Sequence, residues 1–222
     1  MKIIFKYDEN SDIDCLLDKG PGSNNQPSLQ TRTYAELLKF TVDVKNIEKV
    51  REFVRKYIQE QGLDLPKKAS ELQEEWNKIS NEFEKRAEKI FGVKVNDTIS
   101  AYLTITGRFP YNLEQKLFFV SVLRNSANSI AMHELWHFYT WHKFGQEQMI
   151  KLGPQKYNDL KEAITVLLNL ECADLMNGEV DKGYTQHQEL RKQITEYWSK
   201  NKNISGLWEY LADPANISPI SL

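Results

Sequence analysis

Two histidines and a glutamate lie close together near the middle of the chain. The segment 131–138 contains His133, Glu134 and His137 in the order His-Glu-x-x-His. On a helix, side chains four residues apart lie one above the other, so both imidazoles can bind the same metal ion. Zinc is the usual ion at such a pair, and Glu134 can act as a general base on the water that the ion activates. The spacing therefore predicts a zinc site with hydrolytic chemistry.

The residues around this motif predict a buried helix that ends at Gly145. A helix that is apolar over most of its surface packs inside a protein. Histidines and a glutamate within it carry a desolvation cost unless they are paired or bind a metal. Two hydrogen-bonded core histidines beside a solvated glutamate are the alternative interpretation, and the metal site is favoured over it. The apolar residues of this helix are Ile130, Ala131, Met132, Leu135, Trp136, Phe138, Tyr139, Trp141 and Phe144.

A catalytic zinc site needs a third protein ligand in addition to the two histidines. His142 is near in sequence, but the helical rotation points it away from His133 and His137. A carboxylate from a later helix is the remaining route. Glu162 stands at the front of an apolar helix expected over 155–177, far enough along the chain to return beside the first helix. Glu171 is the competitor on the opposite face of that helix, and Glu162 is favoured.

The sequence predicts an α+β fold that is mostly helical, with a small antiparallel sheet preceding the helix of the motif. Alternating β-branched and aromatic residues indicate strands over 2–7, 98–106 and 116–122. Residues 8–32 are rich in turn-forming residues and predict a loop, whereas 33–42 fits either helix or strand. The remaining helices are expected over 46–61, 67–91 and 186–201, with a short turn at 208–211. Residues 1–95 would form an N-terminal region packed on a catalytic domain of residues 96–222.

Composition limits the classes of partner and the compartment. The chain has 222 residues and a formal net charge of -2, which gives no electrostatic reason to bind nucleic acid or an anionic membrane. No stretch is long and apolar enough to span a bilayer, and charged residues interrupt the start too early for a secretory signal. Cys15 and Cys172 are too few for a disulfide framework. A cytoplasmic protein with free thiols is therefore expected.

The motif followed by a helix-borne glutamate resembles the gluzincin group of zinc metallopeptidases over about residues 98–177. The resemblance implies a small zincin-like domain whose strand, here 116–122, binds an extended peptide substrate. The group often has an aspartate four residues after the ligand glutamate to orient a zinc-bound histidine, but this chain has Val166 there. Thr165 or Asn169 could take over that support. The motif is also similar to that of peptidases that cleave phage-type repressors, whose ligand glutamate has a sequence context nearer to Glu171.

In this interpretation His133, His137 and Glu162 hold Zn²⁺, and Glu134 takes a proton from water and delivers it to the leaving amine. The oxyanion needs one further donor. Tyr184 and His187 lie in the polar segment 183–191 that follows the third-ligand helix, and either could supply it. A polar helix cap is the alternative role for this segment.

The sequence is consistent with three different functions. A zinc metallopeptidase acting on a peptide or protein is the main hypothesis. The second is a catalytically inactive protein that keeps a peptidase fold as a binding or adaptor module, but such a protein would not need Glu134 as a base. The third is a zinc hydrolase of a non-peptide amide. The loop expected over 8–32 would serve as a lid or an inhibitory segment in the first case.

Overall fold

The computed structural model describes residues 1–17, 46–107, 110–124, 126–213 and 216. The chain forms two compact units that alternate along the sequence. The first comprises Met1–Asn77 and Asn96–Ala127, and the second comprises Lys78–Val95 and Asn128–Leu222. Helix α4 (Leu65–Phe91) contributes its first half to one unit and its second half to the other. A division of the chain at residue 95 into an N-terminal region and a catalytic domain stays a prediction.

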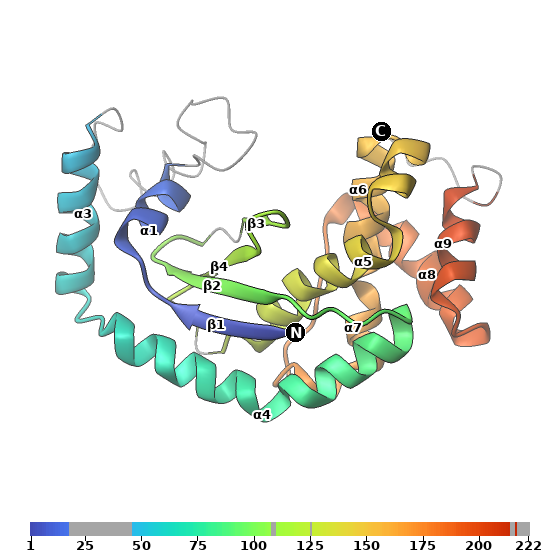
Figure 1. The fold of residues 1–222 in the computed structure, drawn as a ribbon, viewed down its shortest axis with the longest axis horizontal. Helices are drawn as coiled ribbons and strands as arrows, with labels where there is room; N and C mark the ends of the chain where they lie inside the picture. Colours follow the sequence, from blue (N-terminus) through green and yellow to red (C-terminus); the bar gives the residue numbers. More distant parts are fainter. Residues whose placement is uncertain (18–45, 108–109, 125, 214–215, 217–222) are drawn as a thin grey trace. The chain divides into compact units, whose positions relative to one another are not determined.

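The first unit is built on a four-stranded mixed sheet (Figure 1). Its order is β1 (Lys2–Lys6), β2 (Thr98–Thr104), β4 (Leu117–Ser121) and β3 (Tyr111–Asn112). The three strand predictions are confirmed, but the expected antiparallel sheet is wrong, because β1 and β4 both run parallel to β2. The connection after β2 includes β3, which pairs antiparallel with β4. This extra reversal of direction makes β4 parallel to β2.

Helix α1 (Glu9–Leu16) occupies part of the segment that the sequence predicts to be a loop. Its N-cap is Asp8, whose carboxylate accepts a hydrogen bond from the backbone N–H of Ser11 at 2.7 Å. Ile13 and Leu16 are buried, so the helix has an apolar face despite its polar sequence. The loop prediction was therefore wrong for 9–16. Residues 18–32, the rest of the proposed lid, and 33–42 lie outside the described residues.

Two helices complete the first unit. Helix α3 (Ile47–Glu60) contacts α1, and Arg51 and Arg55 form ion pairs with Glu9 of α1. The amide side chain of Gln73 in α4 accepts a hydrogen bond from the backbone N–H of Phe5 in β1 at 3.0 Å. Both helices were predicted from the helical spacing of their apolar residues. The stripe on α4 is buried at Leu72 and Trp76, as expected for a helix that packs on its own protein.

Within the described residues, the second unit consists of helices and the segments that connect them, without a strand. Helix α5 (Asn128–Leu152) carries the motif, and it bends at Gly145, which has φ 40° and ψ -145°. Gly145 thus ends the first helical segment as predicted, but a second segment follows at once. The second half of α4 packs against α5 through aromatic rings, with Phe91 stacked on Tyr139 and meeting Trp136 edge-on. These large buried side chains hold the motif helix in the core of the unit.

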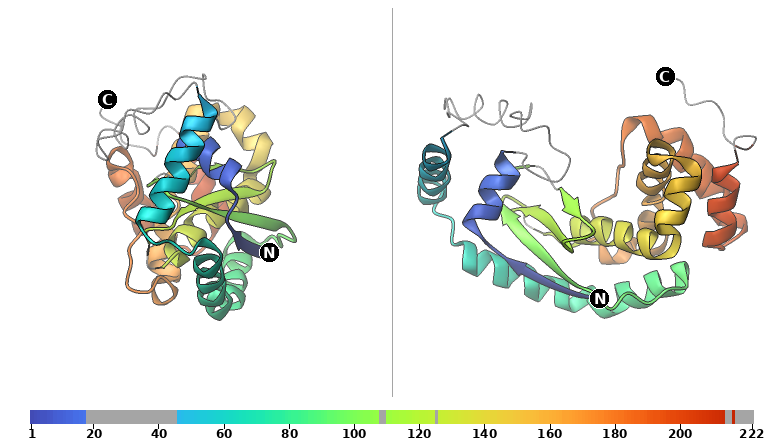
Figure 2. Two further views of the ribbon diagram at one scale, coloured as in Figure 1. Left: turned by 90° about the vertical axis from the view of Figure 1, so that its left-hand side faces the viewer. Right: turned by 45° about the horizontal axis from the view of Figure 1, so that its top comes forward.

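The helices after α5 return beside it. Helix α6 (Pro154–Ala163) packs against α5, and α8 (Gln188–Lys200) packs against α6 and α7 (Val166–Glu171), as can be followed in Figure 2. Two short 3-10 turns lie between α7 and α8, at Ala173–Leu175 and Thr185–His187. Helix α9 (Ile204–Ala212) is longer than the turn expected there. The single helix expected over 155–177 is broken at Ile164 and Thr165, where the Thr165 hydroxyl donates to the carbonyl of Glu162 at 2.8 Å.

The fold is α+β and mostly helical, as the sequence predicts. Cys15 and Cys172 are both buried free thiols. Among the described helices, none combines the length and the apolarity that crossing a membrane requires.

Candidate metal centre

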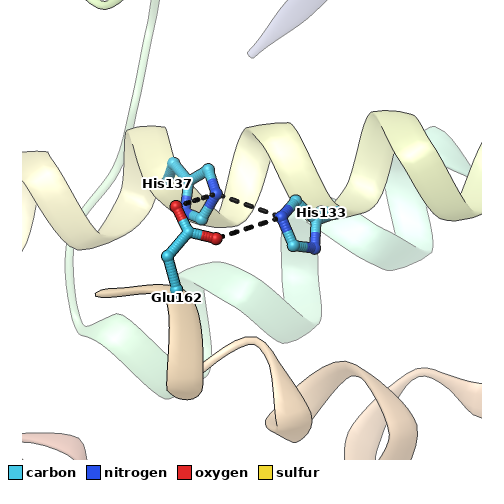
Figure 3. A group of neighbouring side chains, drawn as sticks. All are labelled: His133, His137 and Glu162. Atoms are coloured by element: carbon cyan, nitrogen blue, oxygen red, sulfur yellow. Dashed lines mark hydrogen bonds and ion pairs between the residues drawn. The ribbon is translucent and has the colours of Figure 1, made fainter. Parts of the chain in front are cut away.

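Helix α5 places His133 and His137 on one face, one turn apart (Figure 3). The two rings meet edge-on with centroids 4.7 Å apart, and their Nε2 atoms are 3.1 Å apart. The side chain of His137 is 1% exposed and that of His133 is 24% exposed. The pair therefore faces inward at His137 and reaches an accessible edge at His133, as a site open to a substrate requires.

Glu162 joins the two histidines from the last turn of α6 (Figure 3). Its Oε1 lies 3.4 Å from His137 Nε2, and its Oε2 lies 3.7 Å from His133 Nε2. Ligands about 2.0–2.1 Å from a tetrahedral zinc ion are separated by about 3.4 Å from one another. The three residues can therefore hold a metal ion without a large movement of any side chain.

Burial and hydrogen bonding shift the pKa of each of the three residues of the triad. Burial lowers the pKa of His133, but hydrogen bonds to Asp181 and Glu162 outweigh it and raise that pKa to about 10. Burial lowers the pKa of His137 to about 4. Burial would raise the pKa of Glu162, but its bonds to the two histidines hold that pKa well below its usual range. One proton on His133 thus balances the carboxylate, and a bound cation would take its place.

Asp181 orients His133 from the other side of the ring. Its Oδ2 lies 2.5 Å from His133 Nδ1, and its side chain is 4% exposed. A carboxylate that accepts the Nδ1–H of a histidine leaves Nε2 as the ring atom that binds either a second proton or a metal. Asp181 thus provides the support for which the resemblance implies an aspartate at the position that Val166 occupies in this chain.

Asp181 is itself held by several hydrogen bonds. The amide side chain of Asn169 donates to its carbonyl and accepts from its N–H, both at 2.8 Å. The guanidinium of Arg191 donates to its carbonyl at 2.6 Å and pairs with its carboxylate at 3.0 Å. The Thr165 hydroxyl donates to the carboxylate at 3.3 Å and accepts from Arg191 at 2.9 Å. Thr165 and Asn169 therefore support His133, as the sequence suggested, but they act through Asp181.

Gly183 makes room for this arrangement. Its φ is +58°, and a Cβ built at this position would lie 2.6 Å from Nη1 of Arg191. Gly178, in the same segment, also has a positive φ of +79° but has nothing within 4 Å of such a Cβ. The two glycines thus share a backbone conformation that side chains disfavour. Only Gly183 also has to avoid the guanidinium that fixes Asp181.

Glu134 is buried beside the triad and does not belong to it. It is 5% exposed, and its Oε2 has no hydrogen-bond partner among the described residues. Burial raises the pKa of Glu134 to about 7, and the charge of Glu162 adds to this effect. An unsatisfied buried carboxylate is costly in a folded protein, so such a group is often functional. A carboxyl group that titrates near neutrality suits a residue that takes up and releases a proton.

Tyr184 and His187 are placed differently by the structure. Tyr184 is 54% exposed, and its pKa is raised by partial burial and by the negative charges of Glu162 and Glu134. His187 is buried, with its Nε2 3.0 Å from Oδ1 of Asp159 and its ring edge-on to that of Tyr184. Tyr184 therefore lies close enough to Glu134 and Glu162 to feel their charges. His187 contacts the ring of Tyr184.

The two other candidate ligands lie apart from the triad. His142 is exposed on α5 and is not one of the three clustered ligands. Glu171 accepts from Nε1 of Trp198 at 2.8 Å and pairs with Lys202 at 2.7 Å. These contacts give Glu171 a role in joining α7 to α8. The competition between Glu162 and Glu171 for the histidines is thus resolved in favour of Glu162.

Sequence reasoning missed Asp181, Arg191 and the buried Lys161 as residues of the site. Asp181 lies in an irregular segment between two glycines, where no periodicity predicts the direction of a side chain. Arg191 and Lys161 both stand on helices that carry several other charged residues, so the sequence pattern does not distinguish either of them. One weak signal was present, because two glycines in a short polar segment indicate a backbone that must approach something closely.

No protein-family model, curated protein or solved structure matches this chain.

Replacing Glu162 by alanine should remove the third ligand. We expect zinc affinity to fall more than about 100-fold. This loss exceeds the loss of affinity caused by removing a residue that only hydrogen-bonds to a metal ligand. Glu171→Ala is the matched control, since it removes a carboxylate of the same polypeptide segment and should leave zinc affinity unchanged. Competition with a chromophoric chelator measures both. Stronger loss in Glu171→Ala than in Glu162→Ala would contradict this ligand set.

Gly183→Ala should displace Arg191 and so loosen Asp181. We expect zinc affinity to fall on the order of tenfold, which is typical when the partner of a metal-bound histidine is disturbed. Gly178→Ala introduces the same kind of backbone strain without the clash and should bind zinc nearly as well as the unmodified protein. Equal losses in the two variants would mean that strain in the segment, rather than the position of Arg191, explains the effect.

Proposed function

We propose that this chain is a zinc-dependent metallopeptidase of the gluzincin type, which hydrolyses peptide bonds. The observation that carries the proposal is the convergence of His133, His137 and Glu162 from two helices, with Glu134 buried next to them. The motif alone supplies only two histidines and a glutamate on one helix. The carboxylate of Glu162 on α6 lies as far from the two imidazoles as the ligands of one metal ion lie from each other. This arrangement supports a role in metal binding.

The donor set supports zinc as the ion. Two imidazole nitrogens and one carboxylate oxygen are the ligands of hydrolytic zinc sites, and they leave one coordination position open. When bound, zinc would polarise a substrate carbonyl and bring the pKa of water towards neutrality. Asp181 would keep His133 in the tautomer that presents Nε2, and Glu162 would supply the negative charge.

Glu134 is the proposed general base. Its charge interacts with those of His133 and Glu162, and it is not one of the three clustered ligands, so its carboxylate stays available near the triad. Its unpartnered oxygen can accept the proton of the attacking water and pass it to the leaving amine. A binding module derived from such a fold would have no use for an unsatisfied buried carboxylate.

Tyr184 is the proposed donor to the oxyanion, and His187 and Asp159 would position it. The exposed phenol stands in the field of Glu134 and Glu162, and the His187 ring packs against it while its Nε2 is engaged by Asp159. A phenol hydroxyl can donate to a developing negative charge without itself being charged.

The proposed substrate is a peptide in extended conformation. The resemblance implies a strand that pairs with substrate, and β4 is the counterpart here. Strand β3 pairs with β4 only at Phe118 and Leu117, so in the described sheet Val120 and Ser121 extend beyond β3. A peptide can add to such an edge through its backbone, with little demand on its side chains.

The unmodified protein, purified without added zinc, should contain close to one zinc per chain by elemental mass spectrometry. Incubated with a peptide library read by mass spectrometry, it should cleave peptide bonds. Glu134→Gln should keep the zinc and lose cleavage by at least about 100-fold, because the base is removed while the ligands remain.

Glu147→Gln, which changes an exposed glutamate on the second segment of α5, is the control and should retain activity. Zinc without cleavage in the unmodified protein would favour the binding or adaptor function. Release of only non-peptide amides would favour the third hypothesis. Absence of zinc, with none taken up on addition, would overturn the metal centre.

Tyr184→Phe removes the proposed donor and retains the ring. We expect kcat to fall about 10²- to 10³-fold with zinc content unchanged, as is typical for an oxyanion donor. His187→Gln should have a smaller effect on kcat, because His187 acts through Tyr184. Unchanged turnover in both variants would remove this segment from the mechanism, and a larger loss in His187→Gln would identify His187 as the donor.

A further inference from the structure

Lys161 is a buried lysine at the metal centre. Its side chain is 6% exposed, and it immediately precedes Glu162 in the last turn of α6. Lysine is among the residues least often buried, because its ammonium group loses hydration unless a partner compensates it. A positive charge also suits the carbonyl end of a helix. That end is exposed in many proteins, however, and does not by itself explain why this side chain is buried.

The ammonium group of Lys161 contacts a metal ligand. Its Nζ lies 3.1 Å from Oε1 of Glu162. The same Oε1 faces His137 at 3.4 Å, while Oε2 faces His133 at 3.7 Å. Neighbouring residues of a helix point in directions about 100° apart, so this contact requires the lysine side chain to fold back towards Glu162. One oxygen of the ligand carboxylate is thus shared with a fixed positive charge.

We propose that Lys161 is a positioning residue that holds Oε1 of Glu162, so that the carboxylate offers one oxygen to the metal, and that its charge keeps the ion exchangeable. This inference rests on the proposed metal centre and extends it from the identity of the ligands to the control of occupancy. Lys161 makes no contact with a reacting atom in this role. It acts by holding Glu162 and through its own positive charge.

Two physical consequences follow from the contact. A carboxylate that binds through one oxygen leaves a coordination position open for water, which a catalytic site requires. A positive charge in contact with a ligand carboxylate would also repel a divalent ion held by that carboxylate in a buried site. This repulsion exceeds the value of one orienting hydrogen bond to a charged group. The net effect of Lys161 is therefore to weaken metal binding, although it orders the ligand.

The charge of Lys161 reaches other groups of the centre. The Oε1 atom of Glu162 that Lys161 contacts at 3.1 Å also faces His137 Nε2 at 3.4 Å, so the ammonium charge lies close to two of the proposed ligands. A cation entering between these groups would meet the same field. The protein would then bind zinc more weakly than its ligands alone allow, and its activity would follow the zinc available to it.

Lys161→Met and Lys161→Gln test the proposal by zinc affinity. Methionine keeps much of the apolar stem but removes both charge and hydrogen bond, whereas glutamine removes the charge and keeps a donor. We expect both to bind zinc alone at least about tenfold more tightly than the unmodified protein, measured by competition with a chelator. Lys182→Met removes an exposed lysine next to Asp181 and should leave the affinity unchanged.

Cobalt substitution provides a second measurement that a purely structural role would not change. In Lys161→Met the freed Oε1 should also bind, and the visible absorption of Co²⁺ should weaken as the coordination number rises. Circular dichroism establishes that each variant is folded, and the glutamine variant carries the test if methionine disturbs the packing.

The outcomes separate this inference from the proposed function. Tighter binding in both variants supports it. Unchanged or weaker binding in both overturns it while leaving the metal centre intact. Weaker binding in the methionine variant alone also overturns it, because orientation would then dominate over charge. No zinc binding by the unmodified protein overturns the metal centre and this inference together.

Discussion

The contact between Asp181 and His133 is the interaction on which the arrangement of the candidate metal centre depends. A histidine on a helix can turn about its side-chain bonds, and the carboxylate at Nδ1 is what directs Nε2 towards His137 and Glu162. That carboxylate stands on an irregular segment, so it needs its own supports. Asn169 and Arg191 provide them from two helices, and Gly183 gives Arg191 its space. The segment after α7 therefore orients the imidazole ring of His133 through Asp181.

Charge balance explains how such a cluster can be buried before any ion binds. Three carboxylates lie close to one another, and an isolated ionised carboxylate in a protein interior is strongly disfavoured. Protonated His133, Lys161 and Arg191 supply the opposite charges. The carboxylates are Glu134, Glu162 and Asp181. The cluster is preformed because each ligand already has a partner, and the bound proton on His133 holds the place that a cation would take.

The sequence was sufficient where a regular element fixes the direction of a side chain. The spacing of His133 and His137 on a helix placed both imidazoles on one face, and the apolar stripe of α4 identified its buried side. It was insufficient where direction depends on contacts between distant segments. Asp181 contacts His133 from an irregular segment. Strand β4 runs parallel to β2 because the short strand β3 lies between them along the chain and reverses its direction. Neither arrangement leaves a periodic signal.

The structure places Glu162 rather than Glu171 beside the two histidines, although the sequence argument for that choice rested on an incorrect premise. The sequence argument assumed one straight helix, on which the two glutamates would face opposite sides. The chain instead breaks at Thr165, between α6 and α7. That break has its own use, because it frees the Thr165 hydroxyl to bridge the carbonyl of Glu162 and the carboxylate of Asp181. A continuous helix would have presented Glu162 equally well, but it would have left the residue that orients His133 without this support.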